Sequence, residues 1–336
     1  MEGAMSCGEY ENRCVLVTGG LGFIGSNLVI RLAKLGARVT VIDSLVEGCG
    51  GNIDNVQPVK ESIRIEVADI SDFRCLAPEL EPPHLIFNLA GETSHSGSMK
   101  APMRDLELNA RAQLAFLTTC ADRFPSVRIV YASTRQVYGA PRTLPVAEDH
   151  PIQPVDFNGV NKFAACAYHF VLTNIGKIDA IALRLTNVYG PRMALNLKGQ
   201  GVLSVYLRNA LAGRPIEIYG NGKQLRDPVH VDDVVDAFLR AGISPAGSRI
   251  FNIAGPEVLE IQRIAEIAAE AGHCEIVKRE FKPAEKAIDI GSYYADATRI
   301  GRELKWHPRI RFRQGFQETI RSYAPWAATA CTCVGV

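Results

Sequence analysis

The chain has 336 residues, of which 47% are hydrophobic and 22% charged, and its formal net charge is +1. These values are typical of a globular protein with one large or two ordinary domains, and they give no electrostatic reason to expect nucleic acid or an anionic membrane as a partner. No apolar run approaches the ~18 residues of a membrane span, and residues 1–12 lack the apolar stretch of a signal peptide. We therefore expect a cytoplasmic protein that acts on small molecules.

The sequence contains nine cysteines, an odd number. Several fall within predicted strands and helices: Cys14, Cys75, Cys120 and Cys166. This distribution favours reduced thiols that serve as small apolar residues. Cys331 and Cys333 form a C-x-C pair without further ligands at zinc-like spacing, so we expect no metal site there.

Short β-branched runs alternate with helical patterns in the first half of the chain. The runs predict strands at 14–18, 38–42, 63–67, 85–89 and 128–132. Apolar residues at helical spacing predict a helix at 23–35, which Gly36 ends, and two longer helices at 105–124 and 158–174. Alternating strands and helices imply a parallel sheet covered by helices on both faces.

The two long helices have alanine-rich, fairly apolar surfaces. Their outer faces fit a dimer interface, and a face buried in the protein's own core explains the same pattern. We expect a homodimer and keep both explanations open.

Beyond about Asn187 the pattern loosens, and glycine and proline interrupt it. Shorter elements follow, including predicted helices near 231–241 and 259–271. We interpret residues 187–325 as a smaller C-terminal region, partly interleaved with the first domain, that covers the carboxyl edge of the sheet. Residues 1–12 are expected to be a flexible extension and 326–336 a loose tail.

A glycine-rich turn follows the first predicted strand and opens the first helix: Thr18-Gly19-Gly20-Leu21-Gly22-Phe23-Ile24-Gly25. This is the setting in which a G-x-G-x-x-G pattern binds a dinucleotide, because glycines let the backbone approach the pyrophosphate and let the helix pack close to the strand. The phosphates then lie at the helix N-terminus. The pattern predicts a Rossmann-type doubly wound α/β domain at 13–186.

Asp43 ends the second predicted strand, where a carboxylate receives the adenosine ribose hydroxyls. A carboxylate there repels a 2′-phosphate, so the expected cofactor is NAD rather than NADP. Asp69-Ile70, after the third strand, is expected near the adenine. His230, Asp232 and Asp233 have ligand chemistry, but paired aspartates before a helical run are more typical of an N-terminal cap, and no metal is predicted.

With these residues placed, the chain resembles the extended short-chain dehydrogenase/reductase family of nucleotide-sugar epimerases, dehydratases and decarboxylases. The resemblance runs from about Cys14 to about Ala324. Its motifs, in chain order, are the glycine turn, Asn88-Leu89-Ala90-Gly91, the S-T-R-Q-V-Y-G stretch from Ser133, the R-L-T-N-V-Y-G-P-R stretch from Arg184, and the Y-G-N-G-K-Q-L-R-D-P-V-H-V-D-D stretch from Tyr219.

The resemblance implies roles for individual residues. Thr134 lies where the family's serine or threonine donates a hydrogen bond to the reacting sugar oxygen, and Lys162 where a lysine binds the nicotinamide ribose and lowers the pKa of the base. Catalytic positions are thus Thr134, Asn158 and Lys162. Cofactor positions are Gly19, Gly22, Phe23, Ile24, Gly25, Asp43, Asp69, Ile70, Leu89, Ala90, Gly91 and Lys162. Substrate positions, for a nucleotide-diphosphate sugar, are His95, Thr134, Asn187, Arg192, Tyr219 and Arg226.

Two departures from the family's pattern concern the sugar-facing residues. The family carries a tyrosine base four residues before its lysine, and Asn158 stands there instead. An amide has no proton to exchange at neutral pH, so Asn158 is not the base. The family's 4,6-dehydratases carry Asp-Glu where Arg135 and Gln136 stand, which disfavours that reaction here.

If hydride chemistry persists, the proton must pass through another group. The candidates by sequence neighbourhood are Glu92, His95 and Asp156, and a water held by Thr134 and Asn158 is a further route. The leading hypothesis is an NAD-dependent epimerase that works through a transient keto-sugar. A dehydratase of another type and a binding protein that has lost catalysis remain as alternatives.

Overall fold

A seven-stranded sheet forms the centre of the molecule in the computed structural model, which describes residues 7–72, 74, 80–197, 201–247, 249–281 and 283–323. The strand order is β11-β6-β5-β4-β1-β2-β3, and every neighbouring pair is parallel. The strands are β1 (Cys14–Thr18), β2 (Arg38–Asp43), β3 (Arg64–Val67), β4 (Leu85–Asn88), β5 (Arg128–Thr134), β6 (Asp179–Leu185) and β11 (Arg249–Ile253). This is the predicted Rossmann-type α/β fold.

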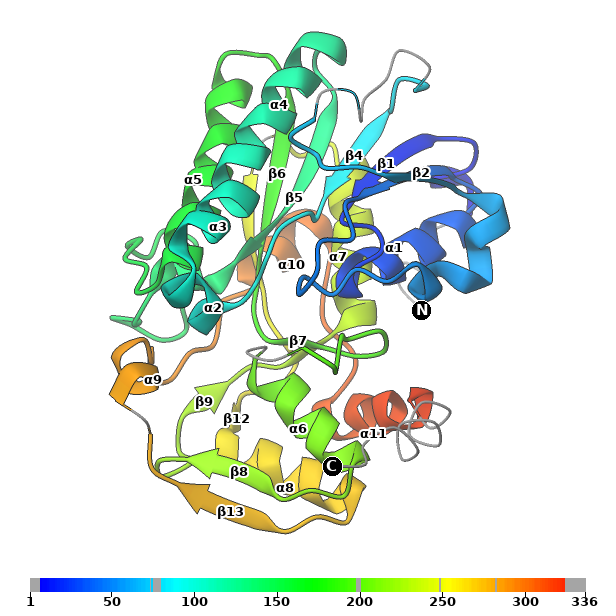
Figure 1. Ribbon diagram of the computed structural model, residues 1–336. Coiled ribbons are helices and arrows are strands. Elements are labelled where there is room, and N and C mark those ends of the chain that lie inside the picture. Colours follow the sequence, from blue (N-terminus) through cyan, green and yellow to red (C-terminus); the bar gives the residue numbers. More distant parts are fainter. Residues whose placement is uncertain are drawn as a thin grey trace.

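Helices cover both faces of the sheet (Figure 1). On one face α1 (Phe23–Lys34) packs against α7 (Val231–Ile243), and α10 (Thr298–Leu304) contacts β11 and α7. On the other face lie α4 (Ala112–Arg123) and α5 (Phe157–Asn174), which contact each other. Because both faces are covered, the central strands are mostly apolar, and β1 and β4 are buried at every residue.

The C-terminal half contributes to both parts of the molecule. Its strand β11 joins the central sheet, and its helices α7 and α10 pack with the sheet domain. The rest packs around its own apolar core at one end of the molecule (Figure 1). It comprises α6 (Val202–Leu211), α8 (Ile261–Gly272), α9 (Pro283–Ala287), α11 (Phe312–Ser322) and the short strands β7 (Val188–Tyr189), β8 (Ile216–Tyr219), β9 (Leu225–Arg226), β10 (Val229–His230), β12 (Leu259–Glu260) and β13 (Ile276–Arg279).

The helix predicted at 105–124 begins earlier and is not uniform. After the short helix α2 (His95–Lys100), the chain forms α3 (Pro102–Leu106), one π-helical segment (Glu107–Arg111) and then α4. Three 3-10 segments complete the description: Cys7–Glu9, Ile53–Ser62 and Arg135–Tyr138. The wider π turn was not predicted because hydrophobic spacing does not distinguish a single π turn inside a longer helix.

The expectation of a flexible extension at 1–12 is wrong for the part that the structure describes. Tyr10 is fully buried, and its hydroxyl donates a hydrogen bond to the Leu239 carbonyl at 2.6 Å. Burial of an aromatic ring and a satisfied hydroxyl fixes this segment against α7. The predicted tail at 326–336, with Cys331 and Cys333, lies outside the described residues, as does Cys75.

Among the described residues, no helix is long and apolar enough to cross a membrane. The described cysteines whose side chains are placed, Cys14, Cys49, Cys120, Cys166 and Cys274, are free thiols.

Candidate active site

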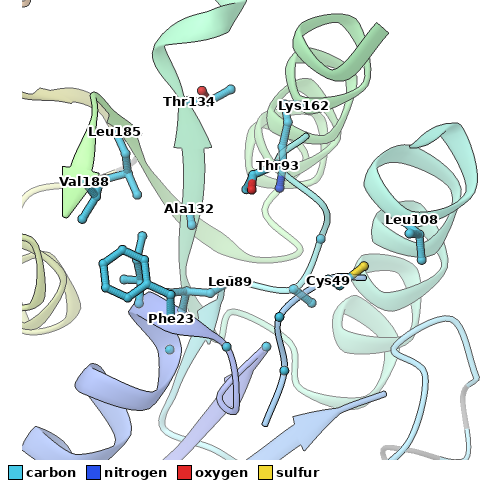
Figure 2. Close-up of a pocket in the computed structure, with 18 of the residues that line it drawn as sticks. Phe23, Cys49, Leu89, Thr93, Leu108, Ala132, Thr134, Lys162, Leu185 and Val188 are labelled. Carbon is cyan, nitrogen blue, oxygen red and sulfur yellow. The ribbon is translucent and has the colours of Figure 1, made fainter. Parts of the chain in front are cut away.

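A deep cavity opens at the carboxyl ends of β1, β2, β4, β5 and β6 and is closed on the other side by residues of the C-terminal half. Met193, Leu203 and Ser204 belong to that second wall. Figure 2 shows Phe23 from α1, Thr134 at the end of β5 and Lys162 extending from α5. The two halves of the chain therefore form one cavity at the edge of a parallel sheet where ligands bind in this fold.

The glycine turn forms one end of this cavity. Gly19 has a φ of +66°, and a Cβ at Gly25 would lie 2.1 Å from the Gly19 carbonyl oxygen. Gly22 precedes α1, whose N-terminus has no side-chain cap. The first amides of α1 are therefore available to an anion, as a pyrophosphate site requires.

Asp43 is fixed beside this turn. Its two carboxylate oxygens accept hydrogen bonds from the Leu21 and Leu45 amides, both at 3.0 Å, and burial raises its pKa. A carboxylate offers about four acceptor sites, so two bonds leave capacity for the hydroxyls of a ribose. Asp69, Ile70, Leu89 and Ala90 also line the cavity. All predicted cofactor residues thus meet at one site, and the geometry fits an adenosine ribose without a 2′-phosphate.

Lys162 lies beside Gly91, at the end of the cavity away from the glycine turn. The lysine is buried, and burial lowers its pKa to about 8, with the nearby charge of Asp105 acting in the opposite direction. Gly91 has a φ of +142°, and a Cβ there would lie 2.6 Å from Lys162 Nζ. Glycine at 91 therefore allows the ammonium group to approach the cavity.

Asn158 is held by a buried polar cluster. Its amide nitrogen donates to the Glu92 carbonyl at 3.0 Å and to Asp105 Oδ2 at 2.9 Å, while Asn161 donates to Asp105 Oδ1 at 2.8 Å. Asn158 and Asp105 are each only 1% exposed. Both N–H groups of the Asn158 amide are thus used inside the protein. Sequence reasoning missed Asp105, which was assigned only to a helix.

His95 and Asp156 form a pair at the cavity wall. His95 lines the cavity, and its Nδ1 lies 3.1 Å from Asp156 Oδ2, although not aligned as in a good hydrogen bond. Asp156 also caps α5, with Oδ1 accepting from the Gly159 amide at 2.7 Å. Burial raises its pKa, but His95, the Gly159 amide and Arg135 together hold the pKa below its ordinary value. The carboxylate is therefore ionised beside the imidazole.

The other proton candidates differ in position. Thr134 lines the cavity; its Oγ1 accepts from the Gln136 amide at 3.2 Å, so its O–H remains available as a donor. Glu92 is not part of the cavity wall, and its carboxylate lies 3.5 Å from the Arg104 guanidinium. The structure therefore brings His95 and Thr134 to the cavity, with Asp156 behind His95, and leaves Glu92 outside.

The predicted substrate residues fall into two groups. Asn187 lines the cavity, and its Oδ1 is buried without a hydrogen-bond partner. Arg192, Tyr219 and Arg226 lie outside the cavity wall. Arg192 donates to Asn27 Oδ1 and the Asn55 carbonyl.

Tyr219 donates to Glu217, and Arg226 donates to the Leu225 and Gly291 carbonyls. These contacts give Arg192, Tyr219 and Arg226 a structural role within the chain. A ligand would contact these three side chains only if part of it lay outside the cavity.

The interpretation of Asp232 and Asp233 as the cap of a helix needs correction. His230 occupies the N-cap of α7 and accepts from the Asp232 amide at 3.2 Å. Asp233 Oδ2 accepts from the Arg309 and Ile310 amides, both at 3.0 Å, and so connects α7 to a later loop. Among the described residues, no group of three His, Cys, Asp or Glu side chains is placed to hold a metal ion.

The fold and the cavity together define a dinucleotide-binding α/β enzyme of the extended short-chain dehydrogenase/reductase type. The profile of the NAD dependent epimerase/dehydratase family matches residues 15–254, and the chain belongs to that family.

Among its relatives, the UDP-glucose 4-epimerase of Mycolicibacterium smegmatis is 33% identical over 313 residues, 92% of this chain and 97% of the relative. The structure of the UDP-glucose 4-epimerase of Thermotoga maritima with UDP-glucose superposes with a TM-score of 0.85 at 26% identity, covering 93% of this chain and 99% of that one. The dTDP-glucose 4,6-dehydratase of Streptomyces venezuelae, with NAD bound, superposes with a TM-score of 0.84 at 27% identity, covering 93% and 97%.

The cofactor of this protein is NAD, and the chain's own residues fit it. The unobstructed α1 N-terminus suits the pyrophosphate, Asp43 suits the ribose, and the buried Lys162 suits the second ribose at the reactive end. The protein is an NAD-dependent enzyme that modifies nucleotide sugars.

Proposed function

We propose that the protein epimerises a nucleotide-diphosphate sugar through a transient keto-sugar, with His95 as the base in place of the family's tyrosine. The observation that carries the proposal is the contact between His95 and Asp156, because His95 lines the same cavity as Thr134 and Lys162. Asn158 is excluded as the base because an amide does not titrate and because its two N–H groups are occupied by Glu92 and Asp105.

The pair can move a proton without tyrosine. Nδ1 of His95 faces Asp156, so Nε2 on the far side of the ring is the nitrogen free to receive a proton. Thr134 donates a hydrogen bond to the sugar oxygen while His95 Nε2 removes the hydroxyl proton, and the Asp156 carboxylate stabilises the imidazolium that forms.

Bound NAD supplies a hydride acceptor that returns the hydride to the sugar carbon. If the ring presents its other face before the hydride returns, His95 gives the proton back to the oxygen and the configuration is inverted. The protonated Lys162 and the amides of α1 hold and orient the cofactor.

The reaction type is tested by product analysis in D₂O. The NAD-loaded protein is incubated with a panel of UDP-, dTDP-, GDP- and CDP-sugars, and the products are followed by NMR and mass spectrometry. An epimerase of this kind yields an isomer of unchanged mass with no deuterium on carbon, because the same hydrogen leaves and returns. A product lighter by one water would instead identify a dehydratase. Tight binding without turnover across the panel would identify a binding protein and refute the proposal.

The role of His95 is tested by substitution and rescue. We expect His95→Ala to lower kcat by roughly 10²- to 10⁴-fold, the usual contribution of a positioned acid–base group, with the affinity for NAD unchanged. Added imidazole should restore part of the activity of this variant. His307→Ala, which removes an exposed histidine outside the cavity, is the matched control.

Asp156 is a positioning residue in this scheme. Asp156→Asn keeps an oxygen that can cap α5 but removes the charge facing His95. We expect a lower kcat with little change in KM or in the unfolding temperature. A variant of wild-type activity at either position would show that the proton takes another route.

A further inference from the structure

Arg135 is a buried cation whose guanidinium has an unused hydrogen-bond donor. The side chain is only 9% exposed, and its Nη1 is buried without a hydrogen-bond partner. Within the described part of the chain, Arg135 takes part in no ion pair and no side-chain hydrogen bond. Burying an unpaired charge is costly, so a guanidinium in this state is expected to serve a ligand that carries a negative charge.

Burial lowers the pKa of Arg135, while the nearby Tyr293, Asp227 and Asp156 act in the opposite direction. The guanidinium carbon lies 4.9 Å from the centre of the Tyr293 ring, a favourable but modest contact. Burial lowers the pKa of Arg226 to about 10, and the nearby charge of Arg135 contributes to this shift. Asp227, a buried carboxylate whose charge acts on Arg135, already accepts from Thr186 Oγ1 and from the Ala295 amide. The charges of Asp227 and Asp156 favour the charged form of Arg135, but within the described part of the chain neither carboxylate forms an ion pair or a hydrogen bond with the guanidinium.

The cavity places Arg135 at the sugar. Arg135 and Gln136 both line the cavity, directly after Thr134 at the end of β5. Gln136 Oε1 is likewise buried without a partner, so the two side chains present adjacent unused donors and an acceptor. Arg135 thus lies in the cavity wall next to Thr134, the residue expected at the reacting sugar oxygen. An anion bound there is a substituent of the sugar ring.

We propose that Arg135 binds a carboxylate carried by the sugar, so that the substrate is a nucleoside diphosphate uronic acid. The planar guanidinium matches a carboxylate in a two-bond fork, and such charge-assisted bonds are about twice as strong as neutral ones. Gln136 adds an amide that can donate to the same carboxylate or accept from a ring hydroxyl. The proposal rests on the proposed function and specifies its substrate class.

The experiment measures binding of UDP, UDP-glucose and UDP-glucuronic acid to the NAD-loaded protein by calorimetry. We expect the wild-type protein to bind UDP-glucuronic acid roughly 10- to 100-fold more tightly than UDP-glucose, as for a buried charge-assisted pair. Arg135→Gln should abolish this preference while the affinities for UDP and UDP-glucose change by less than about 3-fold. Arg135→Lys keeps the charge without the fork and should retain part of the preference. Arg142→Gln, which removes an exposed arginine bonded to Gln153, is the matched control.

Each other result has a distinct meaning. If Arg135→Gln weakens UDP as much as UDP-glucuronic acid, Arg135 holds the diphosphate and the proposal is wrong. If the wild-type protein binds UDP-glucose at least as tightly as UDP-glucuronic acid, the uronate proposal fails while the proposed function stands. If it binds none of the three, the same comparison is made with the dTDP, GDP and CDP ligands, and the absence of binding in every series refutes both proposals. The relative affinities of the wild-type protein for UDP-glucose and UDP-glucuronic acid test the uronate proposal even if the variants do not fold.

Discussion

At the scale of single residues, the departure from the family's tyrosine is explained by the cluster around Asp105. A carboxylate that is 1% exposed accepts from Asn158 and Asn161, and its charge also supports the protonated form of Lys162. Asn158 therefore does more than occupy the position of the missing tyrosine, because it is part of a buried hydrogen-bond network. Its role is to hold the start of α5, including Lys162, against the segment that contains Glu92.

This network predicts that restoring the tyrosine does not restore the usual chemistry. Asn158→Tyr would remove two hydrogen bonds and leave an oxygen of buried Asp105 unpaired, so the free energy of unfolding should fall by about 1–3 kcal/mol. Activity should fall as well. Chemical denaturation and the epimerase assay check this, with Asn174→Tyr at the exposed end of α5 as the control. A more active and equally stable Asn158→Tyr enzyme would refute our view of the network.

Lys162 predicts opposite pH trends for cofactor binding and for stability. Its folded-state pKa is lowered to about 8 from an ordinary value of 10.5. As pH rises through 8, the lysine loses the charge that binds the cofactor, so NAD affinity should fall. The cost of burying that charge disappears over the same interval, so the lysine's contribution to the stability of the NAD-free protein should rise between pH 8 and 10.5.

Comparison with Lys162→Met isolates both trends. NAD titrations and denaturation curves at pH 7 to 10 should show neither dependence in the variant. Equal pH profiles in the two proteins would mean that Lys162 does not titrate in this range.

At the scale of secondary structure, the close packing of α1 against β1 depends on Gly25. A Cβ at 25 would lie 2.1 Å from the Gly19 carbonyl oxygen, whereas a Cβ at Gly22 would lie 3.3 Å from the same atom. Both glycines belong to the same motif, but only a side chain at position 25 would force the backbone to move.

We therefore expect Gly25→Ala to lower the unfolding temperature by several degrees and to abolish NAD binding, since α1 must shift away from the turn. Gly22→Ala should leave the unfolding temperature close to that of the wild type. Thermal unfolding and NAD titration of the two variants provide the comparison. Equal unfolding temperatures would contradict the packing argument.

At the scale of the whole molecule, the helices on one face of the sheet expose apolar side chains. On α5 these include Val160 and Phe163, which are 46% and 40% exposed, and on the neighbouring helical segment Met103, Leu106 and Leu114 are 39–66% exposed. Solvent-exposed apolar groups gathered on adjacent helices are typical of an association surface. The sequence left open whether these faces are core or interface, and the exposure favours the interface.

A homodimer through this surface is a testable prediction. Phe163→Glu should convert a dimer into a monomer, because the charge would be buried at the interface. Sedimentation velocity measures the change, and Val258→Glu, at an exposed apolar residue outside these helices, is the control. A wild-type monomer, or a dimer unaffected by Phe163→Glu, would refute the proposed surface.

The sequence by itself determined the parallel α/β sheet, the glycine turn, the position of Asp43 at a strand end and the NAD cofactor, because these depend on local periodicity and on neighbours within a few residues. The strand order and the strands β6 and β11 came only from the structure. It also identified Asn158, Arg135 and Gln136 as departures. Only the tertiary structure decided what those departures do. Asp105 is 53 residues from Asn158 and lies 2.9 Å away, and His95 is 61 residues from Asp156.

The same limit explains the errors. Asp232 and Asp233 have the composition of a cap, but His230 makes the capping bond and Asp233 bonds to a loop 76 residues away. The substrate roles of Arg192, Tyr219 and Arg226 stay predictions, and in the structure these side chains bond to the chain itself. Burial, pairing and the loss of partners depend on residues brought together from distant segments. The proton route and the unpaired charge of Arg135 are therefore properties of the folded chain, not of any local stretch.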